Sequence, residues 1–211
     1  MTPSAPPLGR LHVLTDTRDG RDALAVVAAA LSAGAPVVQV RSKGGTDRAL
    51  FELAERVARM CDEAGALCLV DDRVDVALAV GAGGTHLGAH DLPLAAARRV
   101  AGPDHVLGGT AREAGLAREL VAQGATYLGV GPTAATSTKD GLPSPLGIAA
   151  VGAVAAAVDV PVIAIGGVTA AHVPDLLAAG VHGIAVVAAV SEASDPAAAV
   201  RALLHALEQA A

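Results

Sequence analysis

We expect this chain to form a single α/β domain, a (β/α)8 TIM barrel, because eight short apolar runs alternate with helical stretches along its 211 residues. Several helical stretches end in a residue followed by glycine, a common left-handed stop, and an apolar run then begins. These junctions are Ala33-Gly34, Ala64-Gly65, Val80-Gly81, Gln123-Gly124 and Ala179-Gly180. A doubly wound open sheet would show the same alternation, but eight repeats in a chain of this length favour the closed barrel.

Each apolar run predicts one strand, and in chain order the strands are residues 11–15, 37–40, 66–70, 84–87, 105–108, 126–130, 161–165 and 183–187. The helices between them are expected to start at Asp22, Thr46, Asp72, Pro93, Glu113, Leu146, Thr169 and Asp195. Asp195 is followed by Pro196, which combines an N-cap carboxylate with a proline at the first helical position. The connections are short except for residues 131–145, whose Thr, Pro and Gly content is typical of a mobile active-site loop.

The composition predicts an aliphatic core and excludes a nucleic-acid surface. Hydrophobic residues make up 53% of the chain, but its aromatic residues are limited to Phe51 and Tyr127. The formal net charge is −6, and no cluster of Lys and Arg supplies the basic footprint that nucleic acid needs. Cys61 and Cys68 have no metal-type spacing, so we expect both to be buried and reduced.

Residues 1–9 are expected to form a disordered tail, and residues 10–211 to form the barrel. The tail is rich in Pro and small residues and lacks the apolar segment of a secretory signal. No uninterrupted apolar stretch reaches the ~18 residues of a membrane span. We therefore expect a cytoplasmic protein with no membrane partner, and the sequence leaves a homo-oligomer open.

The most informative polar residues lie at the end of the second apolar run. Alternation places Gln39, Arg41 and, if the strand continues that far, Lys43 on one face, with Val38 and Val40 on the other. An exposed edge strand would leave these charges solvated. In a closed barrel, which has no edge strand, two cations instead need an anionic partner, and a ligand phosphate would supply one.

Other polar residues also follow the predicted strands, where barrels gather their ligand chemistry. They are Asp71, Asp72, His86, His90, Asp91, Thr110, Thr136, Thr138, Lys139, Gly166 and Gly167. Because the carboxyl ends of parallel strands share one rim, we expect these residues to converge there.

Asp72 and Asp91 follow adjacent strands, so their carboxylates can approach one ion. Two carboxylates completed by water and substrate phosphate oxygens suit Mg²⁺. Either residue could instead cap the next helix. His86 and His90 have the i, i+4 spacing of a zinc pair, but Leu87-Gly88 marks a strand end rather than the continuous helix that this spacing requires.

A glycine pair after the seventh strand, Gly166-Gly167, can expose backbone N–H groups to an anion. The turn at residues 186–189 follows the eighth strand, and barrels often bind phosphate at this corner. Thr136, Thr138 and Lys139 carry hydroxyl and ammonium groups that also suit phosphate. The sequence leaves two alternatives open: the glycine pair could form a tight turn that binds no ligand, and the loop with the threonines and the lysine could simply be solvated.

Taken together, these residues resemble the thiamine phosphate synthase family along nearly the whole chain after its first ten residues. The family signature Gln-x-Arg-x-Lys corresponds to residues 39–43, and Asn-Asp-Arg to residues 71–73. His-Leu-Gly-x-x-Asp-Leu-Pro corresponds to residues 86–93. Gly-Pro-x-x-x-Thr-x-Thr-Lys corresponds to residues 131–139, and Ala-Ile-Gly-Gly to residues 164–167.

The resemblance implies a transferase that condenses a pyrimidinylmethyl diphosphate with a thiazole phosphate, releasing pyrophosphate. It implies that Asp72 and Asp91 hold Mg²⁺ and that Gln39 binds the pyrimidine, with Asp71 beside it. The groups implied to contact the diphosphate are Arg41, Lys43, Thr110 and Lys139. The groups implied to hold the thiazole phosphate are Thr136, Thr138, Gly166, Gly167, Val187 and Ala188. The family's chemistry is dissociative and uses no nucleophilic side chain, so Arg41, Lys43 and Lys139 would act by neutralising charge.

The chain departs from the family pattern at several positions. Asp71 stands where Asn is usual and would either join the metal or face solvent. Arg112 replaces a usual His, Ala134 and Ala135 replace a bulky residue and proline, and Ala188 stands where Ser is common. A related thiazole tautomerase is expected to use a histidine at the position of Arg112. Synthase is therefore favoured over the tautomerase and over a catalytically silent thiazole phosphate-binding regulator.

Overall fold

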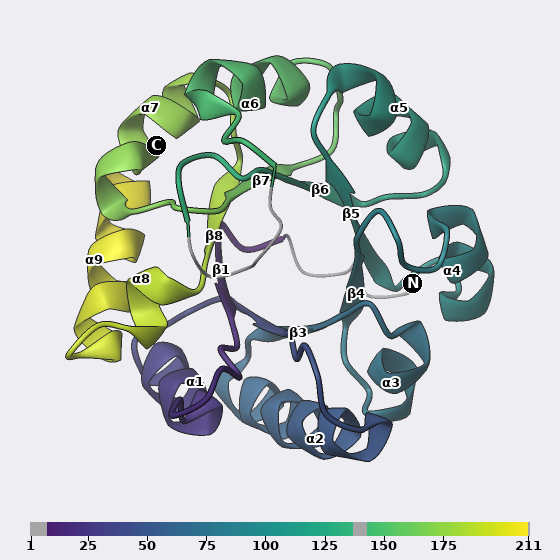
Figure 1. Cartoon of the computed structure of the whole chain (residues 1–211), viewed down its shortest axis with the longest axis vertical. Helices are drawn as coiled ribbons and strands as arrows, with labels where there is room; N and C mark the ends of the chain where they lie inside the picture. The colour runs from purple at the N-terminus through teal and green to yellow at the C-terminus, as the bar shows by residue number, and fades with distance from the viewer. Residues whose placement is uncertain (1–7, 137–142, 211) are drawn as a thin grey trace.

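Eight parallel strands close into a barrel in the computed structural model, which describes residues 8–136 and 143–210. Each strand pairs with the next in chain order, and β1 (Leu11–Leu14) pairs with β8 (Gly183–Val186) to complete the ring. Figure 1 shows the strands as an inner ring with the helices around it. The predicted (β/α)8 barrel is confirmed. Within the described residues, none of the helices has both the length and the apolar character needed to cross a bilayer.

The other strands are β2 (Val37–Val40), β3 (Leu67–Asp71), β4 (Gly84–Leu87), β5 (Val106–Ala111), β6 (Tyr127–Val130) and β7 (Val162–Ile165). The helices are α1 (Ala23–Ser32), α2 (Asp47–Ala64), α3 (Val74–Ala79), α4 (Leu94–Ala101), α5 (Ala114–Ala122), α6 (Gly147–Ala155), α7 (Val173–Ala178), α8 (Ala188–Ser191) and α9 (Pro196–Gln209). A 3-10 turn, η1 (Ala170–His172), precedes α7.

Two strand ends matter for the site. β2 ends at Val40, as predicted, and does not continue to Lys43, because the N–H of Arg41 bonds the Thr15 hydroxyl at 2.8 Å instead of a neighbouring strand. Arg41 and Lys43 therefore lie in the loop after β2. In contrast, β5 extends to Ala111, three residues beyond its predicted end, and so holds Thr110 within the sheet.

The helix starts at Asp22, Thr46 and Asp195 are confirmed by side chains that accept hydrogen bonds from backbone N–H groups in the first turn. The start predicted at Asp72 is wrong. Helix α3 begins at Val74 with Arg73 as its N-cap residue, and no side chain caps it. The short helix α8 was not predicted, because four residues carry no periodic signal.

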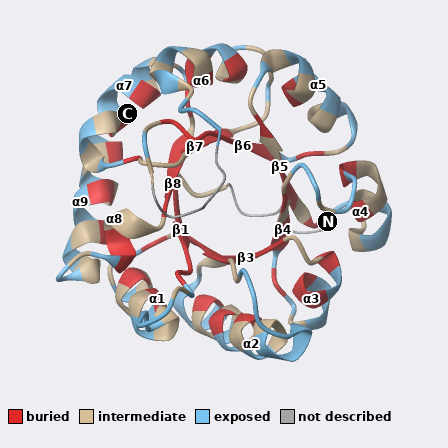
Figure 2. Ribbon diagram, in the orientation of Figure 1, coloured by how far each residue is buried: buried red, intermediate tan, exposed pale blue. Residues whose placement is uncertain are grey.

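Aliphatic side chains on the outer face of the strands pack against the helices, while a smaller cluster fills the inside of the barrel. The strands accordingly form the most deeply buried ring of the molecule in Figure 2. Inside the barrel, Tyr127 and His86 lie over Gly108. A Cβ atom at Gly108 would come within 2.2 Å of the Tyr127 ring and 2.4 Å of His86 Nδ1. The glycine therefore makes room for the largest side chain of the interior.

Cys61 and Cys68 are both free and buried, as the sequence predicts. His12 is also buried inside the barrel, at 1% exposure, and its ring meets Tyr127 edge-on with ring centroids 5.5 Å apart. Its Nε2 lies 3.1 Å from the Gly9 carbonyl oxygen. Burial lowers the pKa of His12 to about 3, so the imidazole is neutral in the folded protein at physiological pH.

The buried His12 predicts a loss of stability in mild acid. An unfolded chain binds a proton at this residue near pH 6.5, whereas the folded chain does so only near pH 3. As the pH falls from 7 to 5, the unfolded state gains the proton first, and His12 lowers the free energy of unfolding by about 2 kcal/mol. Urea unfolding of the parent and of His12→Gln at both pH values measures this, and equal losses in the two proteins would contradict it.

Candidate active site

A cavity of about 560 Å³ opens at the carboxyl ends of the strands. Most of the predicted site residues line it: Gln39, Arg41, Lys43, Asp71, Thr110, Thr136, Gly166, Gly167, Val187 and Ala188. Asp72 and Asp91 lie just outside this lining; Asp72 is joined to it through Lys43, and Asp91 through the N–H of Gly88. Thr138 and Lys139 lie outside the described residues. The expected convergence on one rim is therefore found for the predicted residues that the structure describes.

Asp71 forms the polar floor of the cavity together with the end of β2. Its carboxylate accepts a hydrogen bond from the Gln39 amide, and Arg41 Nε lies 3.6 Å from its Oδ2. Burial, followed by the nearby charge of Asp72, raises the pKa of Asp71 to about 7, although Arg41 and Gln39 oppose the shift. Asp71 is only 9% exposed, so the expectation that it faces solvent is wrong.

Lys43, Asp72 and Asp91 form a second group at the rim, which we call the rim triad. The Lys43 ammonium donates to the Asp72 carboxylate, and the Asp72 and Asp91 carboxyl groups lie close enough to share a proton. Burial raises the pKa of both acids, but the hydrogen bonds with Lys43 and Asp91 hold the pKa of Asp72 below its usual value, while the pKa of Asp91 is raised. The two carboxyl groups therefore lie close enough for their charges to interact.

Backbone geometry aims Asp72 at its partners. Its φ is +65°, and among the described residues other than glycine it is alone in having a positive φ. The N–H of Arg73 donates to the Asp71 carbonyl oxygen at 2.7 Å, which makes Asp72 the centre of a strained γ-turn. The N–H of Asp72 also donates to His86 O at 2.8 Å, so the turn is tied to β4. A residue in this turn cannot cap α3.

Asp91 does not cap a helix either, because its Oδ2 accepts a hydrogen bond from the Gly88 N–H at 2.7 Å. Helix α4 starts after Pro93 without a side-chain cap. Both carboxylates of the rim triad are thus held in place by contacts outside the helix starts, which leaves them available to a ligand.

The two carboxylates of the rim triad suit Mg²⁺ better than Zn²⁺, which prefers His and Cys ligands. A cation between Asp72 and Asp91 would offset the repulsion between their carboxylates. Among the described residues there is no group of three or more His, Cys, Asp or Glu side chains that could hold a metal. The protein therefore supplies two carboxylates here, and water and substrate oxygens would supply the other ligands, which is the coordination that Mg²⁺ favours.

The glycine pair after β7 packs against the loop that follows β6. A Cβ atom at Gly167 would lie 2.5 Å from Ala135 O, and one at Gly166 would lie 2.7 Å from Pro132 Cβ. The N–H of Ala134 donates to Gly166 O at 2.9 Å. Both glycines also line the cavity. The close approach of this loop therefore requires glycine at both positions, whether or not an anion binds to their backbone N–H groups.

His86 and His90 line the cavity, as their expected place on the rim predicts, and Arg112 also lines it; the sequence assigned none of the three a role in binding. His86 Nε2 lies 2.9 Å from Thr110 Oγ1, and its Nδ1 lies 2.9 Å from the Tyr127 hydroxyl, so it orients the Thr110 hydroxyl. Burial lowers the pKa of His86 to about 4 and keeps it neutral. One sequence signal was the alternation on β4, which puts His86 on the inner face with Gly84.

Arg112 joins both ends of the loop that the sequence singled out. Its Nη1 donates to Gly131 O at 2.7 Å and its Nη2 donates to Ser144 O at 3.0 Å. Its partners in these bonds are neutral carbonyl oxygens, so the guanidinium brings a net positive charge to the wall of the cavity. In the sequence, Arg112 lies two residues after Thr110, and strand alternation places residues with this spacing on the same face. This spacing was the signal that could have assigned Arg112 to the cavity.

Comparisons with known proteins point in one direction. A profile described as thiamine monophosphate synthase matches residues 11–190. Proteins named thiamine-phosphate synthase from Salinispora arenicola and Salinispora tropica are 61% and 59% identical over 203 residues, which cover 95% of this chain and 98% of each relative. The solved structure of thiamine phosphate pyrophosphorylase from Pyrococcus furiosus superposes with a TM-score of 0.87 at 35% identity, covering 95% of this chain and 96% of that one.

Replacing Gly167 with alanine tests the packing of the glycine turn. The substitution Gly167→Ala places a Cβ against Ala135 O in a left-handed backbone, whereas Gly147→Ala has a similar φ, +75° against +68°, and meets nothing within 4 Å. We expect Gly147→Ala to lower the free energy of unfolding by about 1 kcal/mol through backbone strain alone. Gly167→Ala should lose clearly more in the same urea titration, and equal losses would show that the loop contact is unimportant.

Proposed function

Since the chain belongs to the thiamine monophosphate synthase family, it is a transferase of thiamine biosynthesis, and we propose that the residues around its cavity carry the reaction. The substrates are 4-amino-2-methyl-5-pyrimidinylmethyl diphosphate and hydroxyethylthiazole phosphate. The C–O bond to the diphosphate breaks, pyrophosphate leaves, and the thiazole nitrogen captures the pyrimidinylmethyl cation to give thiamine phosphate. The strongest support for this assignment of residues is the rim triad beside a cavity whose wall carries Arg41 and Arg112.

The leaving diphosphate would lie between the β2 loop and the β5 end of the cavity. Arg41 and Lys43 already meet carboxylates there, so the incoming phosphate oxygens would enter a site with prearranged cations. The Thr110 hydroxyl, oriented by His86, supplies one more hydrogen bond. Because charge builds up on the departing pyrophosphate, groups fixed in advance stabilise the transition state more than mobile solvent can.

Mg²⁺ would be held by Asp72 and Asp91, and when bound it supplies positive charge to the diphosphate oxygens. The residues of the chain then have two tasks. Lys43 keeps Asp72 ionised, and Gly88 holds Asp91 through its backbone N–H. The strained turn at Asp72 gives its carboxylate one fixed direction.

Gln39 and Asp71 would bind the pyrimidine, since both side chains face the cavity below the cations. Their mutual hydrogen bond fixes the amide and the carboxylate as one unit. An ionised carboxylate next to the ring would also stabilise the positive charge that develops on it as the diphosphate departs. This is the role that we propose for Asp71, in place of metal binding.

The thiazole phosphate would bind on the opposite side, at the Gly166-Gly167 turn and the backbone of Val187 and Ala188. Thr136 lines the same side of the cavity. We keep Thr138 and Lys139 as contacts of the two phosphates, on the basis of the sequence motif. A cytoplasmic location likewise stays a prediction from the sequence.

A thiazole tautomerase would not need the diphosphate machinery, and Arg112 occupies the position where its histidine is expected. A silent regulator would bind the thiazole phosphate and release nothing. Pyrophosphate release from the two substrates with Mg²⁺ separates these functions from the synthase.

The Lys139→Ala variant tests the assignment of the phosphate contacts. We expect pyrophosphate release by the parent and at least a 100-fold lower kcat in the variant, because a cation is lost from the leaving group. The comparison variant is Lys43→Ala, which should also lose activity because it removes a second cation from the leaving group, but it should not raise the Mg²⁺ requirement, since Asp72 is then free of its ammonium partner. Tight binding of thiazole phosphate by the parent without any pyrophosphate release would instead indicate a binding protein.

A pair of conservative substitutions tests which carboxylates hold the metal. Asp91→Asn removes one of the two proposed ligands, so we expect the Mg²⁺ concentration for half-maximal activity to rise at least tenfold. Asp71→Asn should leave that concentration within a factor of two, since the Asp71 carboxylate is engaged by Gln39 and Arg41. A larger shift in Asp71→Asn than in Asp91→Asn would reverse the assignment.

A further inference from the structure

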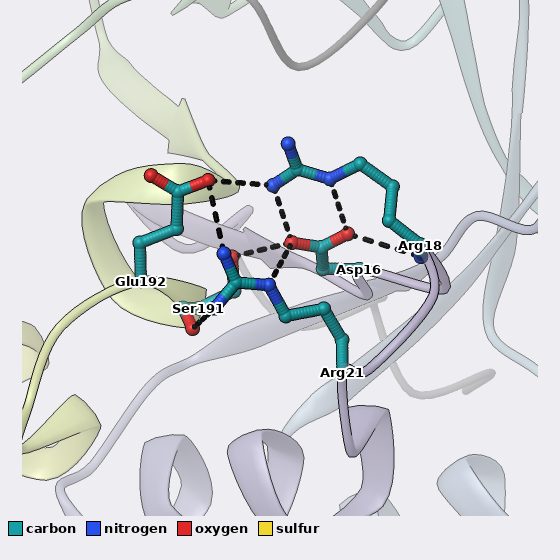
Figure 3. Close-up of polar contacts among 5 residues, drawn as sticks. All are labelled: Asp16, Arg18, Arg21, Ser191 and Glu192. Carbon is teal, nitrogen blue, oxygen red and sulfur yellow. Dashed lines mark hydrogen bonds and ion pairs between the residues drawn. The ribbon is translucent and has the colours of Figure 1, made fainter.

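An ion-pair cluster outside the cavity joins the segment after β1 to helix α8, with its arginines and Glu192 partly exposed. Asp16 follows β1 and is 3% exposed. Its Oδ2 accepts a hydrogen bond from Ser191 Oγ at 2.7 Å, across 175 positions of sequence. Figure 3 shows the Asp16 carboxylate at the centre of the cluster, with Ser191 reaching it from the end of α8.

Two arginines complete the cluster. Arg18 donates to Asp16 from Nε at 2.8 Å and from Nη2 at 2.6 Å, and the same Nη2 lies 2.9 Å from Glu192 Oε1. Arg21 Nε lies 3.8 Å from Asp16 Oδ2, and Arg21 Nη1 donates to the Ser191 carbonyl oxygen at 3.2 Å. The cluster therefore binds the carboxyl end of α8 through hydrogen bonds to both the side chain and the backbone of Ser191.

The other end of this short helix lines the cavity. Val187, Ala188 and Ala189 are cavity residues, and α8 continues only as far as Ser191. A helix of four residues has little stability of its own, because nucleation is unfavourable and few bonds follow it. The direction of α8 must therefore be set by what holds it, and Asp16 holds the end that points away from the cavity.

The residue before Asp16 reaches the opposite side of the cavity. Thr15 Oγ1 donates to Arg41 O at 2.8 Å and accepts from Arg41 N at 2.8 Å. Two consecutive residues after β1 thus contact two separate walls: Thr15 bonds the loop that carries Arg41, and Asp16 bonds the carboxyl end of α8. Because these are different contacts, they can be disturbed independently.

We propose that Asp16 is a positioning residue, which acts through the Ser191 hydroxyl to hold residues 187–189 in the geometry that binds the thiazole phosphate. This inference rests on the proposed function of that wall. Asp16 itself does not line the cavity, so its effect reaches the substrate only through α8.

The decisive variant is Ser191→Ala, because it removes the hydroxyl bond to Asp16 and leaves in place the Asp16–Arg18 pair and the Arg21 bond to the carbonyl oxygen of residue 191. We expect the KM for thiazole phosphate to rise about tenfold, while the kcat and the KM for the pyrimidine diphosphate stay within a factor of two. Ser191→Thr keeps a hydroxyl and should restore most of the affinity. Ser32→Ala is the matched control, since it deletes a hydroxyl that donates to Ala29 O at 2.8 Å on the exposed end of α1, and it should change nothing.

Asp16→Asn, which changes the carboxylate itself, should shift the same KM in the same direction if it folds. An equal rise in both KM values, or a fall in kcat alone, in Ser191→Ala would overturn the inference. If the parent releases no pyrophosphate, the proposed function fails, and calorimetric titration with thiazole phosphate still decides the role of Asp16. Weaker binding by Ser191→Ala than by Ser32→Ala supports it, and equal binding contradicts it.

Discussion

The pairing of β1 with β8 closes the sheet, and the contacts at the mouth of the barrel depend on that closure. Val186, the last residue of β8, lies in register with Val13, one residue before the end of β1. Only a closed ring brings the β2 loop, the β3 and β4 ends and the start of α8 around one cavity. The Asp16 cluster also connects the two sides of the β1–β8 junction, since Asp16 follows β1 and Ser191 follows β8.

Charge is balanced in pairs around the cavity. Arg41 lies beside Asp71, and Lys43 contacts Asp72, so each cation is partly neutralised in the absence of substrate. Such pairing lowers the desolvation penalty of keeping charged groups in a partly buried place. A diphosphate bound to a divalent cation carries charges of both signs. Its oxygens can contact the cationic side chains, and its metal can contact the carboxylates. The cavity is thus suited to a metal-bound anion more than to a free anion.

The sequence allowed much of the fold to be predicted, because its signals are local. Glycine stops, capping residues such as Asp22 and Thr46, and aliphatic runs mark each element within a few residues of its true bounds. The polar residues that follow the strands could be placed on one rim from barrel topology alone. The features that were missed depend on contacts distant in sequence. The γ-turn at Asp72 is bonded to β4, helix α8 is bonded to Asp16 through Ser191, and the Arg41 backbone is bonded to the Thr15 side chain.

The most direct measurement of the central claim is a crystal structure of the protein with Mg²⁺, pyrophosphate and thiazole phosphate. We expect the cation between the Asp72 and Asp91 carboxylates, with pyrophosphate oxygens on Arg41 and Lys43. The thiazole phosphate should lie on the Gly166-Gly167 turn, across the cavity. Pyrophosphate bound at the glycine turn, or a cation bound away from both carboxylates, would contradict this arrangement of the site.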